Sequence, residues 1–236
     1  MMKTELAPNG ILRVGVNLGN FLLVRKDPAT GALSGIVPDL AQELGGRLGA
    51  QVTLVPFAGA GETADGAKSG AWDVAFLGAE PQRAEQIAFT PAYLEIPATY
   101  LVPAGSGLKS LADVDRAGVR IAVSARSAYD LYLSRSLKHA QLVRAEGIQA
   151  SYDLFVAQKL DVLAGLLPRL TSDVTKLPGA RILEGKFTAV QQAVGTPKAR
   201  SEGAAWLREF VADIKATGLV AQLIARHNVK GVNVAP

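Results

Sequence analysis

Short apolar segments of strand length alternate with segments of helical period along this chain, and this alternation favours an α/β architecture. The segments expected to form strands cover residues 12–17, 52–57, 74–77, 97–102, 119–123, 160–163 and 188–194. The first expected helix opens at Pro38 and Asp39, because proline suits a first turn and an acid suits the positive helix end. Gly49 ends that helix. We therefore predict an α/β fold with mixed sheets flanked by helices.

A cluster of breaker residues at 103–107, Pro-Ala-Gly-Ser-Gly, separates the expected elements into two groups. We expect a discontinuous lobe 1 from residues 1–102 and 193–236, and a lobe 2 from residues 103–192. Two strands that cross between the lobes would act as hinge strands. The cleft between two such lobes is the usual place for a ligand, and closure of the lobes would bury it.

Composition excludes several classes of protein. The net charge is +4 with no run of like charges, so we expect no nucleic-acid partner. The absence of cysteine excludes disulfides, thiolate–zinc sites and cysteine nucleophiles. The two histidines, His139 and His227, have no second ligand at metal spacing, and we expect no metal site. A G-x-G-x-x-A pattern at 59–64 is a weak dinucleotide motif, because Gly66 and Gly70 break the helix after it.

Four sequence landmarks follow one another in a fixed order. They are Leu-Arg-Val-Gly-Val at 12–16, Gly-Ile-Val-Pro-Asp-Leu-Ala at 35–41, Trp-Asp-Val at 72–74, and Arg83 followed by Phe-Thr-Pro-Ala-Tyr at 89–93. This ordered set resembles the extracellular solute-binding proteins of family 3, the receptors of polar amino-acid ABC importers. The resemblance implies a two-lobed periplasmic-binding-protein type II fold joined by two hinge strands. It also implies an ABC permease in the membrane as the partner.

The resemblance implies that Arg83 binds the carboxylate of the ligand. A lone guanidinium just beyond the carboxyl end of a buried strand is also well placed to bind a carboxylate through two hydrogen bonds. For Ser127 the resemblance implies a hydroxyl and an N–H donated to the same carboxylate at a helix start, with a plain N-cap as the alternative. Arg126 replaces a small residue of the family, and either adds positive charge to the cleft or points into solvent.

Aromatic and small residues complete the expected binding site. Phe57 occupies the position of an aromatic wall against the ligand side chain, although core packing is the favoured alternative, and Phe21 has the same two interpretations. Phe76 and Gly78 stand where the family has threonine or serine. Gly78 can still offer its backbone groups, but a hydroxyl is lost.

Two expected partners of a ligand amine are missing. Asn17 replaces the first acid that binds the α-ammonium, and the second acid aligns with Leu166 or the adjacent Gly165. A buried ammonium without an anionic partner is costly. Our hypothesis from the sequence is that the ligand keeps a carboxylate and lacks a free α-amine.

The leading prediction is a monomeric solute-binding protein that captures a small carboxylate ligand, an amino acid or related organic acid, without a cofactor and without chemistry. One alternative is a dehydratase-type enzyme of the prephenate or arogenate kind on the same scaffold, with Glu146 and Asp161 as the nearest candidate acids. We expect a periplasmic protein whose leader has been removed. The doubled Met1-Met2 suggests an added start codon, and a leaderless cytoplasmic binding or sensing protein is the other alternative.

Overall fold

The computed structural model describes residues 5–236, so the doubled methionine lies outside the described residues. The chain divides into two compact units: unit 1 ends at Glu95 and resumes at Gln191, and unit 2 is Ile96–Val190. Both boundaries fall inside strands. As a result, β7 (Leu94–Val102) and β12 (Thr188–Pro197) each contribute residues to both units. The breaker cluster at 103–107 follows the end of β7. The first boundary between the units, after Glu95, therefore lies a few residues earlier in the chain than the boundary expected from that cluster.

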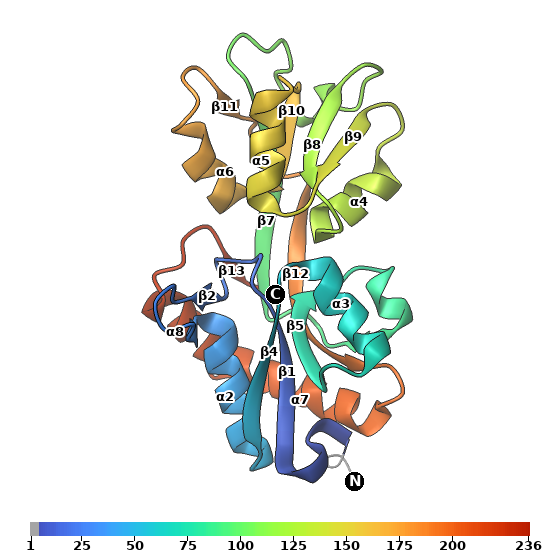
Figure 1. Ribbon diagram of the computed structural model, residues 1–236, viewed down its shortest axis with the longest axis vertical. Coiled ribbons are helices and arrows are strands. Elements are labelled where there is room, and N and C mark those ends of the chain that lie inside the picture. Colours follow the sequence, from blue (N-terminus) through green and yellow to red (C-terminus); the bar gives the residue numbers. More distant parts are fainter. Residues whose placement is uncertain (1–4) are drawn as a thin grey trace. The chain divides into compact units, whose positions relative to one another are not determined.

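Unit 1 is built on a mixed sheet, and the predicted α/β class is confirmed. The strand β1 (Ile11–Asn17) lies between β4 (Gln51–Phe57) and β5 (Val74–Gly78) and is parallel to both (Figure 1). β12 pairs antiparallel with β5. The shorter strands of this unit are β2 (Arg25–Lys26), β3 (Leu33–Ser34), β6 (Ile87–Phe89) and β13 (Asn233–Val234).

The helices of unit 1 are α2 (Ile36–Leu48), α3 (Ala60–Ser69), α7 (Ser201–Ala216) and α8 (Leu219–Arg226), with 3-10 turns η1 (Pro8–Gly10) and η2 (Arg83–Glu85). Helix α2 begins after Gly35, whose φ is +130° and where a Cβ would lie 2.4 Å from the Leu23 carbonyl oxygen. Glycine is therefore required there. Gly49 ends α2 in the left-handed conformation, as predicted.

The glycine-rich segment at 59–64 leads into α3, which packs on a tryptophan. A Cβ at Gly66 would lie 2.5 Å from Nε1 of Trp72, so this glycine makes room for the indole ring. The same Nε1 donates a hydrogen bond to the Thr63 carbonyl oxygen at 2.8 Å. Close packing of a helix on a buried ring therefore explains the glycine at position 66.

Unit 2 has its own mixed sheet, in which β8 (Arg120–Ser124) is parallel to both β9 (Gln141–Ala145) and β10 (Val162–Leu166). β10 and the short β11 (Arg181–Ile182) pair antiparallel with β7. The helical elements are η3 (Leu111–Asp113), α4 (Ala128–Ser136), α5 (Ile148–Ala157) and α6 (Leu167–Val174). The core contains Leu101, Ala122, Phe155, Leu160, Leu163 and Leu170. Across residues 5–236, no helix is both long and apolar enough to cross a bilayer.

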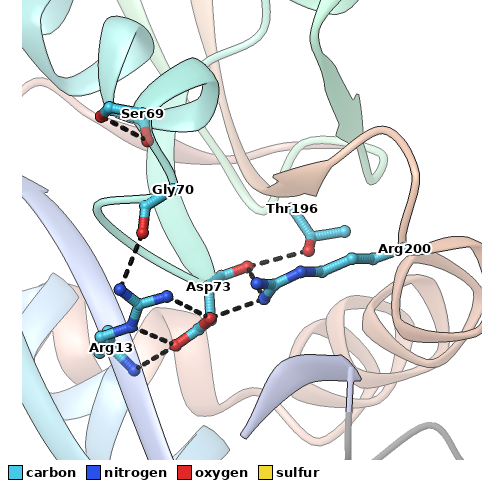
Figure 2. A network of polar contacts seen from close by, with 7 residues as sticks. Arg13, Ser69, Gly70, Asp73, Thr196 and Arg200 are labelled. Carbon is cyan, nitrogen blue, oxygen red and sulfur yellow. Dashed lines mark hydrogen bonds and ion pairs between the residues drawn. The ribbon is translucent and has the colours of Figure 1, made fainter. Parts of the chain in front are cut away.

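Hydrogen bonds to the buried carboxylate of Asp73 link the amino end of β5 to β1 and to the segment after β12 (Figure 2). The side chain of Asp73 is fully buried and accepts from Nε and Nη2 of Arg13 at 2.9 and 2.8 Å. Nη1 of Arg200 donates to the same carboxylate at 2.8 Å. The Asp73 carbonyl oxygen accepts from the Thr196 hydroxyl at 2.9 Å. Every oxygen of Asp73 therefore has a partner, which is the condition for burying a charge without a large penalty.

We expect Asp73→Asn to lower the free energy of unfolding by about 3 kcal/mol, because removal of a buried charge leaves two arginines without their partner. Urea denaturation measures this change. The control is Asp213→Asn, which breaks a partly exposed pair with Arg47 and should cost at most about 1 kcal/mol. Equal losses in the two variants would contradict the structural role of Asp73.

Low pH should remove the contribution of Asp73 to the free energy of unfolding. Burial tends to raise the pKa of this carboxyl, but hydrogen bonds from Arg13 and Arg200 outweigh burial and hold the pKa below its usual value of 3.8. A depressed carboxyl pKa stabilises the folded state above the unfolded-state value, and the gain is lost as pH falls through the folded-state pKa. The difference in unfolding free energy between wild type and Asp73→Asn should be full near pH 7 and shrink below about pH 4. Urea titrations across this range would contradict the account if the difference stayed constant.

Candidate functional site

The carboxyl ends of β1, β4 and β5 meet at one edge of unit 1, because the three strands are parallel. The loops that follow β1 and β4 are joined there by a hydrogen bond from the Leu18 N–H to the Phe57 carbonyl oxygen at 2.9 Å. A Cβ at Gly19 would lie 3.0 Å from the Ala58 carbonyl oxygen, so these loops approach closely. We refer to this edge as the carboxyl edge of unit 1. Asn17, Phe57 and Gly78 are the last residues of its strands.

Arg83 lies just beyond the carboxyl end of β5 and is only 6% exposed. Its Nη1 donates to the Gly78 carbonyl oxygen at 2.8 Å, and its backbone N–H donates to the Glu80 carbonyl oxygen at 2.9 Å. The guanidinium is therefore held against the strand end rather than extended from the outer surface. A guanidinium has five N–H donors, so the bond to Gly78 uses one of several.

The loop after β1 holds two of the expected residues. Oδ1 of Asn17 accepts from the Gly19 N–H at 2.9 Å, which is a local turn contact that shapes the loop. Phe21 follows in the same loop and is 38% exposed, whereas most aromatic side chains of the described chain are covered. An exposed ring at this edge has the accessibility that a ligand contact requires.

Two other expected aromatic residues pack inside unit 1. Phe57 contacts the cluster of Trp72, Ala75, Leu77 and Ile87, in agreement with the favoured core interpretation. Phe76 is buried and meets the Tyr93 ring edge-to-face, with centroids 5.8 Å apart. Because side chains alternate along a strand, Phe76 points to the face of β5 opposite Ala75 and Leu77.

The expected residues of unit 2 lie at the carboxyl ends of its parallel strands. Ser127 is the N-cap of α4, and its hydroxyl accepts from the Asp130 N–H at 3.1 Å. Arg126 precedes it with an exposed side chain and a φ of +56°, a conformation that favours glycine. Leu166 is buried at the end of β10. Burial raises the pKa of Tyr129 to about 12, although side-chain hydrogen bonds with Ser127 and Ser124 oppose the rise.

Asp130 is a residue that the sequence reasoning missed. Its buried carboxylate accepts from the Arg126 N–H at 2.8 Å and from Nε of Arg144 at 3.0 Å. It thereby fixes the unusual backbone of Arg126 and places a negative charge in the first turn of α4. An acid three residues after a serine N-cap is the sequence signal that indicates such a contact.

Two polar residues at the carboxyl edge of unit 1 were also missed. Glu80 is 8% exposed and Asn20 is 7% exposed, although both types of side chain usually face solvent. The available signal was positional, since Glu80 stands three residues before Arg83 and Asn20 follows the end of β1.

The two acids considered for an enzyme lie in other surroundings. Oδ2 of Asp161 accepts from the Arg120 N–H at 2.8 Å, next to the amino end of β10 and on a half-exposed side chain. Glu146 follows β9 and is exposed. Over residues 5–236, no group of three or more histidine, aspartate, glutamate or cysteine side chains is placed to hold a metal ion.

Comparison with solved structures shows the fold. The chain is similar to the solute receptor for L-cysteine of Neisseria gonorrhoeae, with a TM-score of 0.81, 19% identity, and 97% of this chain and 95% of that chain covered. It is similar to a mutant of ArgBP from T. maritima, with a TM-score of 0.78, 20% identity and coverage of 97% and 99%. It is also similar to an ancestral amino acid-binding protein described as a precursor of cyclohexadienyl dehydratase, with a TM-score of 0.77, 21% identity and coverage of 96% and 99%. The comparison with curated proteins finds no match.

The predicted two-lobed type II periplasmic-binding-protein fold is thus confirmed. A family model for the bacterial extracellular solute-binding proteins, family 3, matches residues 12–230. That match covers most of unit 1, all of unit 2 and every expected site residue. The chain belongs to the bacterial extracellular solute-binding proteins, family 3.

Proposed function

We propose that this solute-binding protein takes up a small carboxylate ligand, an amino acid or a related organic acid, and presents it to an ABC permease. The observation that carries the proposal is the buried guanidinium of Arg83 at the carboxyl edge of unit 1. A buried guanidinium binds a carboxylate strongly, because both hydrogen bonds are charge-assisted and water competes little. Ser127, at the amino end of α4 in unit 2, is the second candidate for contact with an anion.

The proposed role is binding without chemistry. The ligand would shift a conformational equilibrium by its different affinity for two states, and the bound form would then be recognised by the permease. The periplasm, a monomeric state and the site residues Asn17, Phe21, Arg83, Arg126 and Ser127 are parts of this proposal.

A dehydratase of the prephenate or arogenate type is the second candidate function. The observation in its favour is the similarity to the ancestral amino acid-binding protein described as a precursor of a dehydratase. A general acid in such an enzyme must lie within reach of the leaving group, usually in a buried site. Asp161 is half exposed and Glu146 is exposed, so neither has this environment. Mass spectrometry of the recovered ligand distinguishes the two functions, because a binding protein returns its ligand unchanged.

A thermal-shift screen over amino acids and small organic acids should identify a stabilising ligand, followed by titration calorimetry. At a hundredfold excess over its dissociation constant, the ligand should add about 2.7 kcal/mol to the free energy of unfolding. We expect Arg83→Ala to weaken binding by about 2–5 kcal/mol, because the ligand carboxylate loses its charged partner.

Because Arg83 is buried, Arg83→Lys is the companion variant: it keeps the charge and loses the planar pair of donors. It should bind more weakly than wild type and more tightly than Arg83→Ala. The control is Arg116→Ala, which removes an arginine whose side chain is 59% exposed and should leave binding unchanged. Wild-type affinity in both Arg83 variants would refute the assignment.

Ser127 can be tested for capping and for ligand contact separately. We expect Ser127→Ala to lower the free energy of unfolding by about 1 kcal/mol, because the Asp130 N–H loses its acceptor. Ser127→Asp keeps a capping oxygen and should restore stability, while its negative charge should weaken binding of a carboxylate at this helix end. Denaturation and calorimetry measure the two effects. Full affinity in Ser127→Asp would assign Ser127 to capping alone.

A further inference from the structure

An ion pair between Asp130 and Arg144 lies at the amino end of α4. The carboxyl ends of β8, β9 and β10 meet at this edge of unit 2, because the three strands are parallel. Asp130 stands in the first turn of the helix that follows β8, and Arg144 is the last residue but one of β9. The pair therefore lies at the edge where Ser127 is the candidate contact of an anion.

The carboxylate of Asp130 reaches back to the start of the helix. Its Oδ2 accepts from the Arg126 N–H at 2.8 Å, and Arg126 precedes the N-cap residue. The side chain of Asp130 is only 4% exposed. A negative group is therefore held beside the positive end of the helix dipole, which is also the place where a ligand anion would bind.

The backbone of Arg126 explains why an acid occupies this place. Its φ of +56° is a conformation that glycine adopts readily and other residues rarely adopt. The hydrogen bond from the Arg126 N–H to Asp130 holds this conformation, and it thereby fixes the turn that leads from β8 into α4. Asp130 is thus needed for the shape of the helix start.

The charge of Asp130 opposes the binding of a second anion at the same helix end. Two like charges repel each other more strongly in a poorly solvated place than in water. An uncompensated Asp130 would therefore reduce the affinity of the helix end for a carboxylate. A site that keeps this acid and binds an anion needs a cation beside the acid.

Arg144 supplies that cation from the neighbouring strand. Its Nε donates to Oδ1 and Oδ2 of Asp130 at 3.0 and 3.2 Å, and its Nη2 lies 3.0 Å from Oδ1. The same Nη2 donates to the Ser134 hydroxyl at 2.8 Å, and that hydroxyl donates to the Asp130 carbonyl oxygen at 2.8 Å. The guanidinium is thus fixed against two successive turns of α4.

We propose that Arg144 is a positioning residue of the binding site, which neutralises Asp130 so that the amino end of α4 can accept a ligand carboxylate. Asp130 supplies the geometry of the helix start, and Arg144 removes the electrostatic cost of that geometry. Arg144 acts through Asp130 and does not contact the ligand itself. This inference rests on the proposed function and adds to it a pair of residues that sets the affinity for an anion.

Calorimetry with the full chain tests the proposal. The titrants are the standard L-amino acids and the 2-oxo acids that share their side chains. The compound that binds wild type most tightly is then titrated into each variant. Arg144→Gln should weaken its binding about tenfold, because Asp130 is left uncompensated near the ligand carboxylate. Arg144→Lys keeps the charge and should bind nearly as tightly as wild type, although it loses the planar contact with both carboxylate oxygens.

Variants of Asp130 separate the effect of charge from general damage to the fold. Asp130→Asn keeps an acceptor for the Arg126 N–H and removes the negative charge, so it should tighten binding about threefold. Structural damage alone would weaken binding. The double variant Asp130→Asn/Arg144→Gln should bind within about twofold of wild type, because the two residues act through each other.

The matched control is Arg120→Gln, which breaks another ion pair of the same sheet. Arg120 begins β8 and pairs with Asp161. The side chain of Arg120 is 43% exposed, close to the 45% of Arg144. Because Arg120 lies at the amino end of β8, away from the start of α4, its variant should keep wild-type affinity.

The failures of the two proposals are distinguishable. If Arg144→Gln binds as tightly as wild type, or if folded Asp130→Asn does not bind more tightly, this inference is overturned while carboxylate binding stands. If Asp130→Asn is unfolded, equal affinities of Arg144→Gln and Arg144→Lys overturn it. If none of the titrants binds wild type, the proposed function itself fails.

Discussion

The parallel pairing of β1 with β4 and β5 is the constraint on which the rest of unit 1 depends. It sends the amino ends of the three strands to one edge and their carboxyl ends to the other. At the amino end of β5, the fully buried Asp73 is bound by Arg13 and Arg200 and is satisfied within the protein. Beyond the carboxyl ends lie Asn20, Glu80 and Arg83, three buried polar side chains. The same strands thus carry a structural charge cluster at one end and the candidate binding groups at the other.

Buried charge has a different role at the amino ends and at the carboxyl ends of these parallel strands. Removing ionised groups from water is unfavourable unless close partners compensate, and the Asp73 cluster provides those partners in a fixed geometry. A binding protein can instead place charged groups where a ligand completes the set, so that part of the compensation arrives with the ligand. Under the proposed function, the ligand carboxylate would add to the contact that Arg83 makes with Gly78. In unit 2, the buried carboxylate of Asp130 at the amino end of α4 accepts from the backbone N–H of Arg126 and forms an ion pair with Arg144.

The sequence predicted the fold class, the family and the strands with the strongest apolar runs, because burial of a parallel strand leaves a direct signal. It did not predict β9, a short strand in which no residue is fully buried. It placed the strand at 160–163 two residues early, because Leu160 is a core residue that precedes β10. The family match confirms the solute-binding assignment, and the interlobe cleft and the site residues remain predictions.

The buried polar residues were harder to predict, because a single acid or amide in a sequence usually lies on a solvated surface. Glu80 and Asn20 are recognised as exceptions only when the backbone places them at the carboxyl edge. The most direct test of the account is a crystal structure of the complex with the ligand that the binding screen identifies. The account predicts both ligand carboxylate oxygens at about 2.7–2.9 Å from the Arg83 guanidinium nitrogens. A ligand carboxylate bound elsewhere, with no contact to Arg83, would contradict it.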